Sequence, residues 1–130
     1  MSTPTTGLSE AARAIRALEA EFQRLANAND AAGIAEAFFA DDACLQPPNT
    51  PQVNGKAAIR EFWKAFLAAG LSNVTLETGD VYASGDLAYN TGKYGYTAGG
   101  ERHEGKYLVV HRRQADGSYK AVADTFTSNK

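Results

Sequence analysis

Residues 105–127, GKYLVVHRRQADGSYKAVADTFT, contain the pattern that decides the fold. Residues that favour strands lie on both sides of Ala115-Asp116-Gly117, which is typical of the turn in a β-hairpin. Towards the N-terminus, Ala98-Gly99-Gly100 and Ser84-Gly85-Asp86 predict two more turns. The second half of the chain therefore predicts a meander of four antiparallel strands, the first with a bulge at Gly79-Asp80.

The first half of the chain predicts three helices instead. Ser9 is the expected N-cap of the first helix, which ends near residues 27–29. Its apolar positions recur at helical spacing: Ile15, Leu18, Phe22 and Leu25. Glu19 is grouped with the charged residues expected to face solvent. Residues 1–8 are expected to form a disordered tail, and residues 9–130 a single folded domain.

Two shorter helices follow this first one. Asp30 is the expected cap of the second helix, which ends before Asp41-Asp42, a solvated corner. Residues 43–46 predict a short strand that stops at Pro47-Pro48. Asn54-Gly55 opens the third helix, whose apolar residues recur at helical spacing: Ile59, Phe62, Trp63, Phe66 and Leu67. Helices followed by strands predict the α+β class, with the helices on one face of a curved sheet.

Composition and charge exclude several classes of protein. The chain has 130 residues, 44% of them hydrophobic and 22% charged, as in an ordinary globular domain. A formal net charge of −2 offers nucleic acid no electrostatic footprint, and no apolar run is long enough to span a membrane. One cysteine, Cys44, cannot form an internal disulfide. We therefore expect a cytoplasmic protein without nucleic-acid or membrane partners.

Five short stretches, in order, resemble the nuclear transport factor 2-like superfamily. They are Ala28-Asn29-Asp30, FFADDA at 38–43, NGKAAI at 54–59, GKYLVV at 105–110 and DGSYK at 116–120. Their order and spacing resemble in particular the SnoaL-like and ketosteroid-isomerase-like branch of small bacterial proteins. The resemblance implies a cone-shaped, cystatin-like roll, in which a strongly curved antiparallel sheet wraps around a long helix and encloses an apolar cavity.

The same resemblance implies what the chain lacks. In ketosteroid isomerases the general base is an Asp shortly after the Asp-Asp-Ala turn, and Pro47 stands at that position here. The family's oxyanion hole uses an Asp on the penultimate strand and a Tyr on the first helix. Val109 stands at the strand position, and Phe22 or Gln23 at the helix position. Steroid isomerisation with the family's usual groups is therefore not expected.

Strand alternation selects the side chains that face the cavity. Tyr107, Val109 and His111 share one face of the penultimate strand. The resemblance makes the position of Val109 one that faces the cavity, and the same comparison with the family implies that Val122, Asp124 and Phe126 face inward from the last strand. Hairpin pairing places Val109 beside Asp124, with His111 diagonal to the acid. Asp124 and His111 are the candidate catalytic residues.

Two interpretations of these groups stay open at this point. Asp124 in an apolar setting can serve as a general acid or base, or it can simply bond to a backbone amide or a tyrosine as part of the core. His111, followed by Arg112 and Arg113, can act as an assisting group or only as a packing residue. With two histidines and no ligand spacing, the sequence predicts no metal site and no cofactor.

Aromatic residues suggest the walls of the cavity. Tyr94 and Tyr96 alternate onto one face, and with Trp63, Phe66 and Phe126 they can enclose a flat, apolar ligand. The candidate ligand-binding residues are Tyr94, Tyr107, Val109, Val122, Phe126 and Trp63. The alternative is that the same rings fill the cone and leave no cavity.

Apolar residues on the opposite sheet face predict a homodimer. Leu108 and Val110 point away from the cavity, and Ala121, Ala123 and Thr125 are expected on the same outer face, which the helices cannot cover. Two classes of function remain: a small-molecule pocket protein acting as a lyase, isomerase or hydrolase on a small apolar ligand, and a non-catalytic binding or dimerisation module.

Overall fold

Three helices and six strands make up residues 5–129, the part of the chain that the computed structural model describes, with side chains described for residues 10–129. The helices are α1 (Thr5–Asn27), α2 (Ala31–Phe38) and α3 (Lys56–Ala68). The strands are β1 (Phe39–Gln46), β2 (Val53–Asn54), β3 (Ser72–Ser84), β4 (Leu87–Ala98), β5 (Glu101–Arg113) and β6 (Tyr119–Ser128). The α+β class predicted from the sequence is confirmed.

The six strands form one sheet in the order β2-β1-β6-β5-β4-β3. Neighbouring strands run antiparallel except β1 and β6, which pair in parallel. The sequence predicted the meander of β3 to β6 but not this parallel pair or the two-residue strand β2. β1 pairs with β6 because α2, packed on the sheet, delivers the chain to the free edge of the hairpin.

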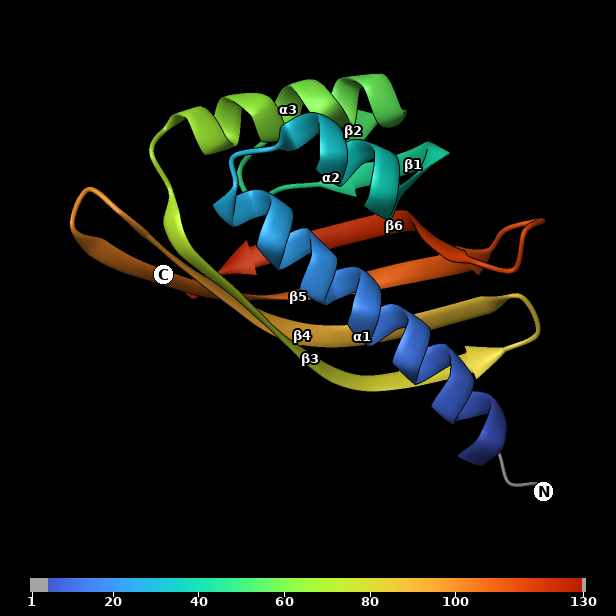
Figure 1. Ribbon diagram of the computed structural model, residues 1–130. Helices are drawn as coiled ribbons and strands as arrows, with labels where there is room; N and C mark the ends of the chain where they lie inside the picture. The colour runs from blue at the N-terminus through green and yellow to red at the C-terminus, as the bar shows by residue number, and fades with distance from the viewer. Residues whose placement is uncertain (1–4, 130) are drawn as a thin grey trace.

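All three helices lie on one face of the sheet, which we call the inner face (Figure 1). α1 crosses β3 and β4 diagonally, and α2 and α3 stack over the end of the sheet formed by β1 and β2. The main core between helices and sheet contains Phe38, Phe39, Leu45, Ile59 and Val109, all buried. The long inner face is therefore covered along its whole width by residues from all three helices.

Several expected boundaries move by a few residues. α1 is already helical at Thr5, so Ser9 is not its N-cap, and residues 5–8 belong to the helix instead of a tail. Residues 1–4 of the expected tail and residue 130 of the expected domain lie outside the described residues. β1 begins at Phe39, so Asp41 and Asp42 lie within a strand. The side chain of Asp30 caps α2 by accepting from the Gly33 amide at 2.9 Å, as expected.

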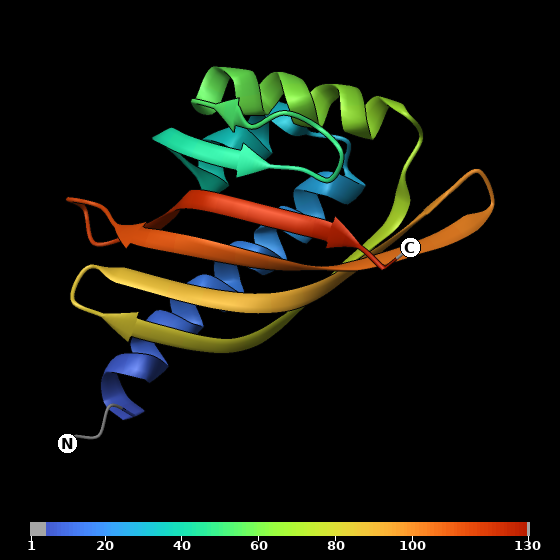
Figure 2. The same cartoon turned by 180° about the vertical axis from the view of Figure 1, so that it is seen from behind.

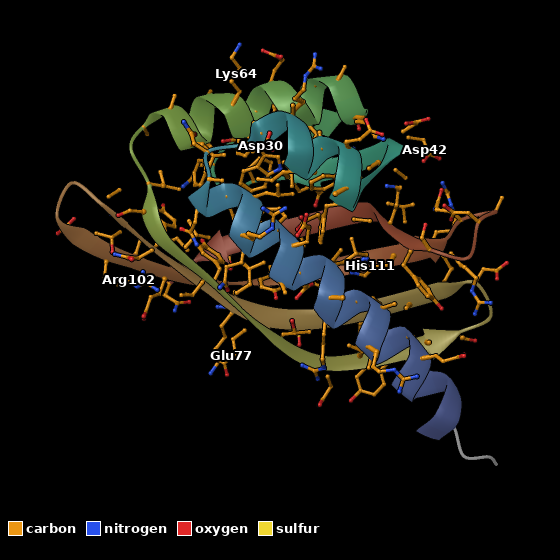
Figure 3. All side chains as sticks on the ribbon, viewed as in Figure 1. Asp30, Asp42, Lys64, Glu77, Arg102 and His111 are labelled. Atoms are coloured by element: carbon orange, nitrogen blue, oxygen red, sulfur yellow. The ribbon has the colours of Figure 1, made fainter. Side chains whose placement is uncertain are left out.

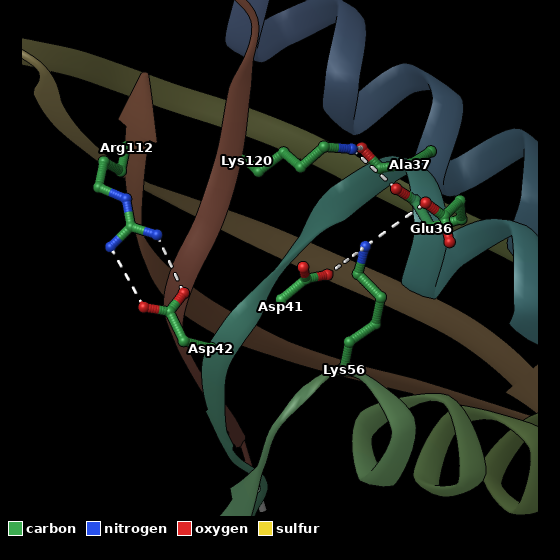
Figure 4. Close-up of polar contacts among 7 residues, drawn as sticks. All are labelled: Glu36, Ala37, Asp41, Asp42, Lys56, Arg112 and Lys120. Atoms are coloured by element: carbon green, nitrogen blue, oxygen red, sulfur yellow. Dashed lines mark hydrogen bonds and ion pairs between the residues drawn. The ribbon is translucent and has the colours of Figure 1, made fainter. Parts of the chain in front are cut away.

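Asp41 and Asp42 make salt bridges that fasten β1 to its neighbours (Figure 4). Lys56 at the start of α3 lies 3.1 Å from Asp41, and Arg112 of β5 lies 2.9 Å from Asp42. Lys120 of β6 donates to the carbonyl oxygen of Glu36 at 2.8 Å. These contacts join α2, α3, β1, β5 and β6 at one exposed corner.

Bulges and turns shape the sheet. The bulge expected at Gly79-Asp80 is present, because the register of β3 on β4 shifts between Thr78 and Val81. A second shift occurs in β6: Val110 pairs with Ala123, but His111 pairs with Ala121. Val122 is therefore an extra residue, and side chains before it alternate in the opposite sense from those after it.

No helix covers the outer face of β3, β4, β5 and β6 (Figure 2). Four large hydrophobic residues are exposed there: Tyr82, Leu87, Tyr89 and Leu108. The rings of Tyr82 and Tyr89 stack at 5.2 Å, and Val110 is the cross-strand partner of Tyr89. Ala121 was expected on this face, but the β6 bulge turns it into the core, where it is fully buried. Within residues 5–129 no helix is both long and apolar enough to cross a membrane.

Candidate functional site

A small cavity of about 70 Å³ lies between α1, α3 and the inner face of the sheet. Eight of the seventeen residues that line it are aromatic: Phe22, Phe38, Trp63, Phe66, Tyr94, Tyr96, Tyr107 and Phe126. The only acidic residues among the seventeen are Glu19 and Asp124. The site is therefore an aromatic enclosure that contains two carboxyl groups.

The aromatic walls come from facing elements. Trp63 of α3 stacks on Phe126 of β6 with ring centroids 5.8 Å apart, and its edge meets Phe22 of α1 at 5.3 Å. Phe66, one helical turn further along α3, meets Tyr96 of β4 edge-on at 5.6 Å. Helical spacing thus places two rings of α3 over the strands, as the sequence predicted.

Two glycines make room for the tyrosines of the wall. Gly92 is the cross-strand partner of Tyr107, and Gly105 that of Tyr94. In each pair the tyrosine ring lies across the glycine so closely that an added Cβ atom would collide with it. The Tyr94 hydroxyl reaches the carbonyl oxygen of Thr127 at 3.0 Å, and burial together with Tyr96 raises the pKa of Tyr94 to about 12.

Asp124 faces this cavity from β6. It pairs with Val109 across the β5–β6 hairpin, as expected, and both residues line the cavity. Asp124 is 8% exposed, and none of the described residues forms a hydrogen bond or salt bridge with its carboxyl group. Burial, and secondarily the charge of Glu19, raise the pKa of Asp124 to about 8. At neutral pH its carboxyl group is therefore mostly protonated and unpaired.

Glu19 of α1, expected on the solvated face, is instead 1% exposed. Three donors converge on its carboxylate: the hydroxyl groups of Tyr107 at 2.5 Å and Thr78 at 2.7 Å, and the amide of Asn90 at 2.9 Å. Burial, followed by the charge of Glu19 and the hydrogen bond to it, raises the pKa of Tyr107 well above its usual value.

The sequence contained a signal for Glu19 that a helical wheel reveals. Glu19 stands four residues after Ile15 and three before Phe22, so it lies on the buried stripe itself. Ile15 and Phe22 were correctly placed in the core. Charge alone led to the wrong prediction, because a carboxylate can be buried when several donors satisfy its oxygens.

His111 does not line the cavity and lies at the far end of the hydrogen bonds that begin at Glu19. Figure 3 shows it on the sheet beside α1. Its Nε2 atom is 3.1 Å from the side-chain oxygen of Asn90, and its ring meets Phe38 edge-on at 5.7 Å. The side-chain NH2 group of Asn90 donates to Glu19, so the side-chain oxygen of Asn90 is the acceptor in its bond with His111. His111 is therefore assigned its proton on Nε2. Burial lowers the pKa of His111 to about 4, so it is neutral.

The β6 bulge explains why two expected residues are not in the site. His111 pairs with Ala121, not with Val122, so the alternation that was expected to place His111 diagonal to Asp124 is broken. Val122 itself is half-buried and is not among the residues that line the cavity. The other predicted lining residues, Tyr94, Tyr107, Val109, Phe126 and Trp63, all line it.

A metal centre has no support in the described part of the chain, where no group of three or more His, Cys, Asp or Glu residues is arranged to hold an ion. Cys44 is half-buried on β1. Asn90 and Thr78 join the site only through Glu19, so sequence patterns gave no reason to select them. Chemically, the site combines an apolar enclosure with one satisfied and one unsatisfied carboxyl group.

The model of the SnoaL-like domain matches residues 11–122, most of the chain. The chain belongs to the SnoaL-like domain family. No curated protein matches the sequence. The match runs from within α1 to the first residues of β6, so it includes most of the cavity lining but ends before Asp124 and Phe126. It confirms the resemblance on which the fold was predicted.

Solved structures are similar to this SnoaL-like domain in fold. A ketosteroid isomerase-like protein from Erwinia carotovora has a TM-score of 0.79 at 20% identity, over 91% of this chain and 95% of that chain. A protein of unknown function from Mycobacterium tuberculosis has a TM-score of 0.82 at 20% identity, over 98% and 77%. An NTF2-like protein with a cystatin-like fold from Novosphingobium aromaticivorans has a TM-score of 0.77 at 21% identity, over 100% of this chain and 92% of that chain. At these identities the likeness shows the fold alone.

Proposed function

We propose that this SnoaL-like domain binds a small, largely apolar ligand in the cavity, and that Asp124 contacts the ligand's polar group. The observation that carries the proposal is the unpaired carboxyl group of Asp124 in an aromatic enclosure. Burying a polar group without a partner costs free energy, typically about 1–3 kcal/mol in proteins. A ligand that supplies the missing partner recovers that free energy on binding.

The chemistry of Asp124 suits proton transfer. A pKa of about 8 lets this carboxyl group release or take up a proton near neutral pH, which is the property of a general acid or base. Reactions of the isomerase, lyase and hydrolase classes use such a group. His111 does not line the cavity, so the proposal assigns the chemistry to Asp124, with Tyr107 beside it on the same wall.

The size of the cavity limits how the ligand is held. At about 70 Å³ the cavity is smaller than the several hundred Å³ common for small-molecule sites. Five lining residues are only partly buried and form its open end: Phe66, Leu71, Leu76, Tyr94 and Tyr96. We therefore propose that one compact group of the ligand enters the cavity while the rest packs against these residues.

Fragment binding by NMR tests this proposal. Phenol, cyclohexanol and cyclohexanone are titrated into the isotope-labelled protein, and shifts are expected at the amides of Val109, Asp124 and Phe126. Val109→Phe fills the cavity and should abolish them. Leu108→Phe, the neighbouring position on the outer face, should leave them unchanged. Shifts that survive in the Val109→Phe variant, or no shifts at all, would overturn the proposal.

The alternative class, a non-catalytic dimerisation module, is favoured by the outer face. Large hydrophobic residues are exposed on β3, β4 and β5 of this face, which none of the helices within residues 5–129 covers. We propose that a second copy of the chain packs on this surface to form a homodimer, whether or not the cavity binds a ligand. The missing steroid-isomerase groups at Pro47 and Val109, the cytoplasmic location, and the absence of cofactor, metal and nucleic-acid partners stay predictions.

Light scattering at micromolar concentration tests the dimer. The expected particle has twice the 13.9 kDa mass of the chain. Tyr89→Glu, in the middle of the outer face, should shift the particle to monomer, whereas Glu61→Lys on the exposed side of α3 should not. A wild-type protein that scatters as a monomer would refute the homodimer.

A further inference from the structure

The inner wall of the cavity holds the carboxyl group of Glu19, which has no cationic partner among the described residues. Glu19 is 1% exposed, and its three hydrogen-bond donors are all neutral groups. Among the described residues no lysine, arginine or charged histidine forms a salt bridge with it. His111, two hydrogen bonds away, is neutral because burial lowers its pKa to about 4. Buried carboxylates are normally paired with a cation, so this one is unusual.

A second carboxyl group faces the same cavity. Asp124 is more than nine-tenths buried and has no partner among the described residues, and its separation from Glu19 is small enough for the two to interact electrostatically. None of the seventeen lining residues carries a basic side chain. The cavity therefore attracts a positive charge and repels an anion.

The aromatic walls act in the same direction. The faces of tryptophan, tyrosine and phenylalanine rings are electron-rich and attract cations, most strongly where water is excluded. Phe126 follows Asp124 on β6 and stacks on Trp63 of α3, and Tyr107 bonds directly to Glu19. An aromatic enclosure with a carboxylate at its base is a recurring way to bind ammonium groups.

We infer that the ligand of this cavity carries a compact ammonium group, a primary or methylated amine, which enters the aromatic enclosure and pairs with Asp124. The inference rests on the proposed function and names its ligand class. The volume of about 70 Å³ admits a group of a few non-hydrogen atoms, so the apolar remainder of the ligand lies at the open end beside Phe66 and Tyr96.

Binding of an ammonium group is expected to release a proton from Asp124. Free Asp124 holds a proton at neutral pH, since its pKa is about 8. The incoming cation favours the ionised carboxylate, so Asp124 releases that proton to solvent while the amine keeps its own. Affinity therefore rises by up to about tenfold per pH unit between pH 6 and 8, as expected for one released proton.

Isothermal titration calorimetry with four probes of one shape tests the inference. Benzylamine, benzyl alcohol, acetophenone and benzoate share a ring and differ in the charge of the polar group. At pH 7, benzylamine is expected to bind at least about tenfold more tightly than benzyl alcohol, and benzoate not at all. Titration in two buffers of different ionisation enthalpy should show close to one proton released per benzylamine.

Asp124→Asn provides the matched variant, because it keeps the shape and removes the charge. It should stay folded by circular dichroism and lose both the preference for benzylamine over benzyl alcohol and the release of a proton. Asp80→Asn, an exposed position on β3, is the control and should change neither.

The outcomes separate the inference from the proposed function. If benzyl alcohol or acetophenone binds in the cavity as tightly as benzylamine, the ammonium inference is wrong and the proposed function stands. If benzylamine keeps its preference in Asp124→Asn, the inference is also wrong. If no probe binds in the cavity, both fail.

Discussion

Glu19 and Asp124 are two buried carboxyl groups on one cavity, and their surroundings differ in almost every respect. Glu19 comes from a helix, accepts three hydrogen bonds and lies in a network that reaches from β5 to β3 and β4. Asp124 comes from a strand and bonds to none of the described residues, and apart from Glu19 the other residues of the cavity wall are apolar or aromatic. Burial is similar, at 1% and 8% exposed.

The difference separates a structural role from a functional one. A carboxylate that satisfies three donors stabilises the fold through all of them, because each would otherwise be buried without a partner. A carboxyl group with no partner contributes nothing of this kind, and its charged form is disfavoured. Substitutions should therefore affect the two positions in opposite directions.

Glu19→Leu should give the largest effect. The change leaves the side chains of Tyr107, Thr78 and Asn90 without their shared acceptor, and the free energy of unfolding should fall by about 3–5 kcal/mol. Urea denaturation followed by circular dichroism measures the loss. Glu21→Leu, two residues further along α1 with a side chain that is 41% exposed, is the control. Equal midpoints for the two variants would show that Glu19 does not anchor the network.

His111→Gln should remove a pH dependence of stability. Burial lowers the pKa of His111 from 6.5 to about 4, so as the pH falls through this range the unfolded chain takes up a proton that the folded chain does not. The stability that is complete above pH 6.5 is lost towards pH 4, by about 3 kcal/mol. The variant should lack this part of the slope in unfolding experiments at stepped pH. An unchanged slope would mean that His111 titrates normally.

Asp124→Asn should stabilise the protein, by about 1–2 kcal/mol at pH 8 and by less at pH 5. The pKa of Asp124 is raised from 3.8 to about 8, so the folded protein holds this proton more tightly than the unfolded chain. Wild-type stability therefore falls as the pH rises between these values, and the amide removes that loss. Thermal melts at both pH values measure the gain. A variant less stable than wild type at pH 8 would contradict this account.

Asp42→Asn should have the smallest effect. The carboxylate of Asp42 is exposed and pairs with Arg112 on the surface, where water and salt screen the charges. Its hydrogen bonds with Arg112 hold the pKa of Asp42 below its usual value. The denaturation midpoint is expected to stay within error of wild type in moderate salt. A loss as large as that of Glu19→Leu would show that the corner of Figure 4 anchors β1.

Local patterns were sufficient for most of the fold. The turns at residues 85, 99–100 and 117 were correctly placed because each contains a glycine with positive φ, and the bulge at Gly79-Asp80 was recognised from the same chemistry. Asp30 was recognised as a helix cap because its side chain can accept from a backbone amide. The β1–β6 pair was missed because it joins residues far apart in the sequence, for which no local pattern exists.

The site was predictable only in part for a related reason. Val109 and Asp124 were correctly placed together, but not by the register of the turn. The pairs nearest the turn, which include His111 with Ala121, would continue to Val109 with Ala123, and the bulge at Val122 brings Asp124 opposite Val109 instead. The β6 bulge at Val122 contains no glycine by which the sequence could have indicated it. The bulge places Ala121 on the inner face, where Val122 was expected, and keeps Val122 out of the cavity lining. Glu19 was missed because its burial depends on donors from β3, β4 and β5, which come together only in the folded protein.

The parallel β1–β6 pair also has a consequence for synthesis of the chain. Phe39 pairs with Ala121, so β1 has no long partner until 82 further residues have been translated. At about 5–20 residues per second, this interval lasts for seconds, during which an apolar strand edge is open to other nascent chains. The two-residue strand β2 is made early, but it pairs with the opposite edge of β1 and leaves the edge for β6 uncovered. A chain released before β6 is made would therefore keep the unpaired edge of β1 and be prone to aggregate. Chaperones, or rapid pairing of β6 with β1 after synthesis, would protect the domain.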